Sequence, residues 1–116
     1  MKLLGLQAES AAPGTARVWG TVRPEHLNLH STAHGGFIYT LADIAFALAA
    51  NSHDVPAVAL ATHMEYLLPG KAGDELEATA TEVHLGRSTA LYRIEVRCGG
   101  NLLATFTGTV FRKQPK

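Results

Sequence analysis

The chain has 116 residues, with 10 Lys and Arg against 10 Asp and Glu, so its formal net charge is zero. This length predicts one domain over residues 1–116, and the lack of a basic excess argues against nucleic acid as a partner. The single cysteine, Cys98, excludes an intrachain disulfide and fits a reducing cytoplasm, where we expect the protein to act. The apolar run 37–50 is shorter than the roughly 20 residues that span a bilayer, so no membrane association is expected.

The predicted elements follow in the order strand, helix and four further strands. Alternating polar and apolar residues, closed by Pro, Gly or Asn, indicate the strands. The first strand precedes the helix, and the four after it are predicted to pair antiparallel in sequence order. The predicted strands are 15–23, 56–68, 74–84, 89–98 and 102–112, and the helix runs from Gly35 to about Asn51.

The predicted helix lacks a polar stripe. Apolar residues surround its axis, which predicts burial on nearly all sides, and five alanines between 42 and 50 would let other backbones approach closely. A five-strand meander could cover such a helix only by curling around it, and one face would still be free for a second copy. The pattern predicts an α+β fold, a curled antiparallel sheet of about five strands around one long central helix, in a homo-oligomer.

Asp43 is the only formally charged side chain between His26 and His53. Burying a lone carboxylate in an apolar helix costs on the order of several kcal/mol unless something compensates its charge. Such a residue is a candidate functional group, although a buried Asp can also cap a neighbouring strand or helix end.

Three segments, 28–36, 41–47 and 51–52, resemble the hot-dog-fold acyl-CoA thioesterases, and most closely their phenylacetate-degradation (PaaI) subfamily. The likeness extends through 66–69 and 85–89 to 104–112 and rests on the combination of Asn28, His34-Gly35-Gly36 and Asp43. The resemblance implies a hot-dog fold and hydrolysis of a CoA thioester. The implied substrate is an arylacetyl-CoA, of phenylacetyl or hydroxyphenylacetyl type, or a medium acyl-CoA. Coenzyme A would be part of the substrate, with no separate cofactor.

Thioester hydrolysis needs donors for a developing oxyanion and a base or nucleophile. The start of a helix offers unsatisfied N–H groups, so we assign the Gly35 N–H, together with that of Gly36, as oxyanion donor. A Gly-rich helix cap is the alternative. Asp43 would attack the carbonyl or activate water. Eight residues place Asp43 about 12 Å from Gly35, which predicts a site shared across a two-fold interface. A dimer is the minimal unit, and a tetramer is the expected assembly.

Further residues are assigned by the resemblance or by chemistry. Asn28 could bind the carbonyl or the attacking water, or simply form a turn. His34 could orient the thioester or cap the helix. The acyl pocket would draw on Phe37, Leu41 and Tyr66, which could equally be core. The turn residues Arg87 and Ser88 could contact CoA phosphates, or be solvated surface.

Two further patterns in the sequence bear on this interpretation. The spacing of His26, His30 and His34 would align three imidazoles on a helix, but the segment is predicted to be a loop, so no metal site is expected. The hydroxyl residue that the family often carries on the strand after the helix aligns with Ala59. The nearest hydroxyl, that of Thr62, points away from the Ala59 side only if the strand is regular.

Two other functions remain open at this point. A hot-dog enoyl-CoA hydratase is one, because the segment 28–30 faintly matches a hydratase pattern, although His26 stands where that pattern has Asp. A non-catalytic acyl-CoA-binding protein is the other, but it would not need Asp43.

Overall fold

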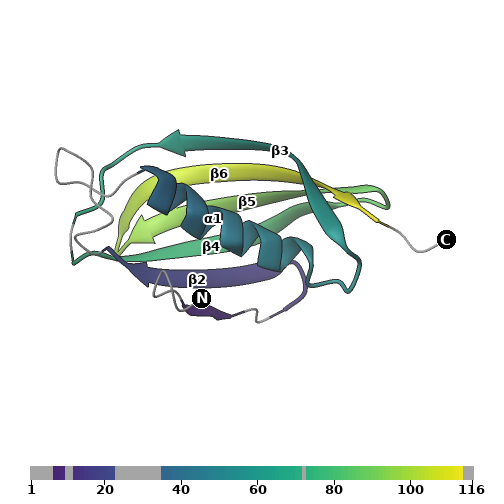
Figure 1. Ribbon diagram of the computed structural model, residues 1–116, viewed down its shortest axis with the longest axis horizontal. Helices are drawn as coiled ribbons and strands as arrows, with labels where there is room; N and C mark the ends of the chain where they lie inside the picture. Colours follow the sequence, from purple (N-terminus) through teal and green to yellow (C-terminus); the bar gives the residue numbers. More distant parts are fainter. Residues whose placement is uncertain (1–6, 10–11, 23–34, 72, 114–116) are drawn as a thin grey trace.

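The computed structural model describes residues 7–9, 12–22, 35–71 and 73–113, which form one helix and six strands (Figure 1). All the predicted elements are present, and their ends differ from the predicted ends by at most two residues. Within the described ranges, no helix has the length and apolar character needed to cross a membrane. The elements are β1 Gln7–Glu9, β2 Thr15–Thr21, α1 Gly35–Ala50, β3 Ala57–Tyr66, β4 Glu75–Leu85, β5 Thr89–Cys98 and β6 Asn101–Arg112.

The six strands form one antiparallel sheet in the order β1-β2-β4-β5-β6-β3. The predicted antiparallel sheet around a helix is thus confirmed, but the sequential meander is wrong. β3 pairs with β6 at one edge, and β2 takes the place beside β4. The helix carries the chain across the sheet between β2 and β3, which puts these two strands on opposite sides (Figure 1). The three-residue β1 adds a sixth strand that is too short for an alternation pattern to reveal.

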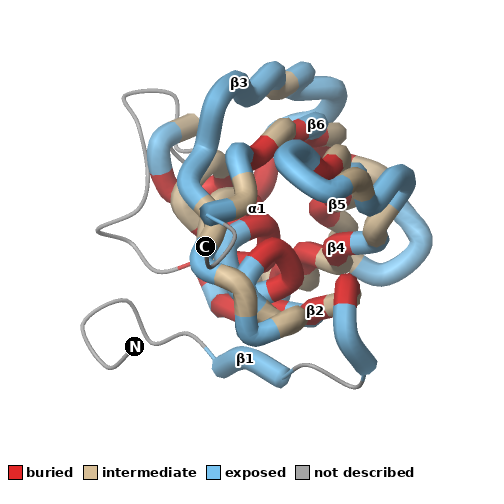
Figure 2. The backbone as a smooth tube through the Cα atoms, turned by 90° about the vertical axis from the view of Figure 1, so that its right-hand side faces the viewer, coloured by how far each residue is buried: buried red, intermediate tan, exposed pale blue. Residues whose placement is uncertain are grey.

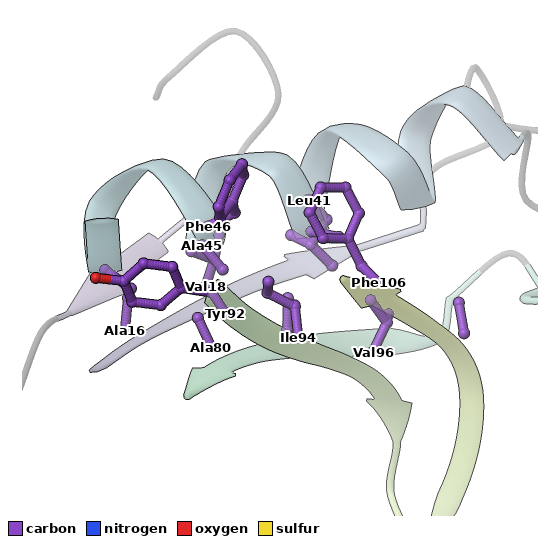
Figure 3. Packing of buried hydrophobic residues seen from close by; sticks show 14 of the residues in the cluster. Ala16, Val18, Leu41, Ala45, Phe46, Ala80, Tyr92, Ile94, Val96 and Phe106 are labelled. Atoms are coloured by element: carbon purple, nitrogen blue, oxygen red, sulfur yellow. The ribbon is translucent and has the colours of Figure 1, made fainter. Parts of the chain in front are cut away.

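The hydrophobic core lies between α1 and the concave face of the sheet (Figure 3). Phe46 of the helix packs against Tyr92 and Phe106, with ring centroids 6.0 and 5.4 Å away. Gly108 makes room for this ring, because a Cβ at Gly108 would lie 2.6 Å from Phe46 ring carbons. Such close packing fixes the helix firmly on the central strands.

α1 is buried on one face in the single chain, and the opposite face is left uncovered, as the prediction of a face free for a second copy requires. Gly36, Ala47 and Leu48 are exposed, and Thr40 and Asp43 are half-buried. The sheet covers the opposite face, and in Figure 2 the buried turns of α1 lie toward the central strands. The buried residues are Phe37, Ile38, Leu41, Ala42, Ala45, Phe46, Ala49 and Ala50.

β3 is exposed along its length (Figure 2). It has β6 as its single neighbour in the described sheet, and none of its 10 residues is buried. Large apolar side chains are nevertheless frequent there: Val58 is 43%, Leu60 58% and Tyr66 53% exposed. An apolar edge strand of this length is a surface suited to pairing with another strand.

Candidate active site

Gly35 is the first residue of α1, and the first turn contains no acidic side chain that would neutralise the helix N-terminus. No described residue accepts a hydrogen bond from the Gly35 N–H. On the other side of this residue, the Tyr66 hydroxyl donates to the Gly35 carbonyl oxygen at 3.1 Å. The helix start therefore offers the Gly35 N–H as a donor, while the Gly35 carbonyl oxygen is occupied by the hydroxyl of the last residue of β3.

Asp43 lies half-buried on the face of α1 that the sheet leaves uncovered. Within the described residues, its carboxylate makes no hydrogen bond or ion pair, so it caps no described strand or helix end. Partial burial raises the pKa of Asp43 above its ordinary value. A carboxylate with a raised pKa and no partner is a better proton acceptor than an ordinary surface Asp.

Gly35 and Asp43 are kept apart by the helix that carries both. α1 is continuous from Gly35 to Ala50, so the eight-residue separation corresponds to about 12 Å along the axis. One thioester group cannot contact both residues of the same chain.

The proposed acyl-pocket residues differ in their placement. Phe37 and Leu41 belong to the core and are 8% and 0% exposed, whereas Tyr66 is 53% exposed. Of the three, Tyr66 has the surface that a ligand could reach from outside a single chain.

Arg87 and Ser88 lie in the turn between β4 and β5, at the opposite end of α1 from Gly35. The Ser88 carbonyl oxygen accepts from the Arg112 N–H at 2.7 Å, and Arg112 pairs with Ala57. Residue Ala57 in turn donates to the Asn51 side chain, directly after the helix. The length of α1 therefore separates this turn from Gly35 by about 24 Å.

Asn28 and His34 lie outside the described residues, as do His26 and His30. In the part of the chain that is described, no group of three or more His, Cys, Asp or Glu side chains could hold a metal ion.

β3 is not a regular strand where the family-type hydroxyl is missing. A bulge lies between Ala59 and Ala61, so Ala59 pairs with Val110 and Thr62 with Gly108, both buried partners on the inner face. Ala59 and Thr62 consequently face the same side, toward α1. The Thr62 hydroxyl lies 3.0 Å from that of Tyr39.

Tyr39 was missed by the sequence reasoning. It lies four residues after Gly35 and four before Asp43, and its ring packs on Phe106 at a centroid distance of 5.5 Å. The signal was available, because residues four apart on a helix are neighbours on one side. Its hydroxyl contact with Thr62 ties the second turn of α1 to the middle of β3.

The profile of a family described as "Thioesterase superfamily" matches residues 30–105. Acyl-coenzyme A thioesterase PaaI of Escherichia coli is 46% identical over 95 residues, which cover 82% of this chain and 68% of that protein. The phenylacetic acid degradation protein PaaI of Thermus thermophilus, solved as an Asn-to-Asp variant, is 58% identical with a TM-score of 0.92, covering 97% of this chain and 96% of that chain.

A Streptococcus mutans protein solved with acetyl-CoA bound is 32% identical with a TM-score of 0.89, covering 96% of this chain and 90% of that one. The chain belongs to the thioesterase superfamily, has the hot-dog fold that the resemblance implied, and is a thioester hydrolase.

Proposed function

We propose that the chain is an acyl-CoA thioesterase whose active site combines Gly35 of one protomer with Asp43 of another. One observation carries the proposal: a half-buried carboxylate, unpaired among the described residues, lies on the uncovered face of α1, about 12 Å from the open helix start. Relatives named as acyl-CoA thioesterases and a neighbour solved with acetyl-CoA support the substrate class.

In the proposed reaction, the thioester carbonyl oxygen accepts hydrogen bonds from the Gly35 N–H and from that of Gly36. These donors stabilise the negative charge that develops on this oxygen. Asp43 either removes a proton from the attacking water or attacks the carbonyl carbon itself. In both cases the carbon–sulfur bond breaks, CoA leaves as its thiolate, and water supplies the oxygen of the acid product. Asn28 and His34, just before Gly35, would orient the thioester and the water.

The contacts between β3 and α1 indicate how two chains would share this site. The centre of β3 lies at Ala61 and Thr62, and the Thr62 hydroxyl contacts Tyr39, midway between Gly35 and Asp43. A two-fold axis through paired β3 edges would therefore pass level with Tyr39. Such an axis moves Asp43 of the partner subunit to the level of Gly35. The unused edge of β3 and its exposed apolar side chains are suited to this pairing.

The same axis would place the partner's Arg87 and Ser88 beyond the helix start, on the side where CoA would extend. A cation and a hydroxyl there could contact its phosphates. The acyl group would then lie near Tyr66 and the exposed fringe of Phe37, above Leu41. We propose an arylacetyl group, of phenylacetyl or hydroxyphenylacetyl type, or a medium acyl chain. The dimer is the functional unit, and a tetramer would pack two such dimers.

The test of the shared site mixes two inactive variants. Asp43→Asn removes the base with nearly unchanged shape, and Gly35→Pro removes the N–H at the first helical position, where proline is tolerated. Each homodimer lacks one half of both sites, whereas a mixed dimer regains one complete site. Exchanged subunits should recover up to half of wild-type hydrolysis of phenylacetyl-CoA or hexanoyl-CoA per mixed dimer. Random mixing lowers the total further.

The control is Gly35→Ala, which keeps the N–H and whose Cβ would make an ordinary 3.5 Å contact with Tyr66. It should retain far more activity than Gly35→Pro. No recovery after proven exchange of folded subunits would contradict the shared site. Hydration of an enoyl-CoA without cleavage of any acyl-CoA would overturn the thioesterase assignment itself.

A further inference from the structure

We infer that Tyr66 is, through its hydroxyl, a positioning residue for the oxyanion donors that acts on the Gly35 backbone, while its ring borders the acyl group. This inference rests on the proposed function. Its starting observation is that the Tyr66 hydroxyl donates to the Gly35 carbonyl oxygen at 3.1 Å. The two residues are 31 positions apart in sequence, so the contact joins the end of β3 to the start of α1.

Tyr66 is itself held rigidly. It pairs with buried Ala104 of β6, and the N–H groups of Leu67 and Leu68 both donate to the Leu103 carbonyl oxygen, at 2.8 and 3.1 Å. The Tyr66 ring lies directly beside Gly35, because a Cβ built there would be 3.5 Å from the ring Cζ. The hydroxyl therefore approaches the helix start from a fixed strand.

The carbonyl of Gly35 and the N–H of Gly36 belong to one planar peptide unit. A hydrogen bond that fixes the carbonyl consequently fixes the direction of the N–H as well. Donation to the carbonyl oxygen also polarises the unit and strengthens its N–H as a donor. Two successive glycines have the greatest backbone freedom of any pair, so this helix start has most to gain from an external contact.

The phenol is suited to a donor role. Partial burial raises the pKa of Tyr66 above its ordinary value, and the nearby Tyr39 raises it further. The hydroxyl thus keeps its proton over the pH range in which a carboxylate base would be active.

A matched control exists in the same contact between α1 and β3. Tyr39 and Thr62 form a second hydroxyl contact between α1 and β3, at 3.0 Å, but it involves side chains and leaves the Gly35–Gly36 peptide alone. Tyr66→Phe and Tyr39→Phe therefore make the same chemical change, each removing one hydroxyl between the same two elements.

The experiment compares these two variants with the wild type, after sedimentation has shown that all three proteins have the same oligomeric mass. Tyr66→Phe should lower kcat about 5- to 20-fold, less than the loss of an oxyanion donor itself, with KM within about twofold. Tyr39→Phe should stay within about twofold in kcat. The ratio of kcat/KM for phenylacetyl-CoA to that for hexanoyl-CoA should be unchanged in Tyr66→Phe, because the hydroxyl does not select the acyl group.

An activity-independent measurement separates this inference from the proposed function. The amide resonance of Gly36, and its hydrogen-exchange rate, should change in Tyr66→Phe but not in Tyr39→Phe. An unchanged Gly36 amide or an unchanged kcat in Tyr66→Phe would overturn the positioning role, as would a shift in acyl preference. If the wild type hydrolyses no acyl-CoA, the proposed function fails, and the Gly36 amide still decides whether Tyr66 holds this peptide.

Discussion

β5 and β3 are strands of equal length, 10 residues each, in the same sheet, and they differ in almost everything else. β5 alternates buried and less buried residues between two neighbouring strands and beneath α1, whereas β3 has no buried residue and one neighbour in the described sheet. The strands under α1 thus form the buried core of the protomer, whereas β3 is left exposed. Gly35, Tyr66 and Asp43, which the proposed site uses, all lie on this exposed side of the protomer. Stability is concentrated in one region, and the proposed chemistry in the other.

The largest expected effect comes from a change in the buried core under α1. Phe106 is fully buried against Phe46, so Phe106→Ala should lower the free energy of unfolding by about 3–5 kcal/mol. Leu60→Ala on β3 removes a side chain that is 58% exposed and should cost less than about 1 kcal/mol in the isolated protomer. Urea unfolding at low protein concentration measures the free energy of unfolding of both variants. Equal losses would contradict the contrast between the buried core and the exposed β3.

The second prediction tests the exposed edge strand β3. Leu60 and Val83 are both 58% exposed and both sit at β-bulges, but β3 is an edge strand and β4 lies inside the sheet. Leu60→Lys should place two charges near the proposed axis, lower the oligomeric mass and reduce hydrolysis at least about tenfold.

Val83→Lys, the matched control, should keep the dimer and its activity. Sedimentation and steady-state hydrolysis read out the two variants. An intact, active dimer in Leu60→Lys would mean that the chains associate through another surface.

The smallest expected effect concerns the charge of Asp43. Its raised pKa means that the folded state binds the proton more tightly than the unfolded state, so the wild type loses stability as pH rises through that pKa. Asp43→Asn should therefore raise Tm at pH 7 by about 1–2 °C. This gain should disappear as pH falls below the ordinary Asp value of 3.8.

The control is Asp54→Asn, which removes the same charge from an exposed position. Asp54 has a φ of 59°, a left-handed conformation that Asn also adopts readily. Because this side chain is exposed, the substitution should leave Tm at pH 7 nearly unchanged. If neither variant gains in Tm, desolvation of the Asp43 carboxylate does not destabilise the folded state, whatever the role of Asp43 in catalysis.

The sequence by itself determined the local elements and the chemistry along one helix. Alternation over 89–98 and the Gly-Gly-Asn turn after it specify β5 and the start of β6, because side-chain direction in a strand repeats every two residues. The separation of Gly35 from Asp43 follows equally from sequence, since the rise of a helix is fixed per residue. That separation alone predicted a shared site.

Only the tertiary structure decided which surfaces stay uncovered. The partner of β3, the bulge that turns Ala59 and Thr62 to the same side, and the Tyr66 contact with Gly35 all join residues far apart in the chain. No local period encodes such pairings, because strand register is set by the whole sheet. The exposure of Asp43 was hidden for the same reason. A helix without a polar stripe indicates that most of its surface will be covered, but only the fold shows which face the sheet covers and which is left for a second copy.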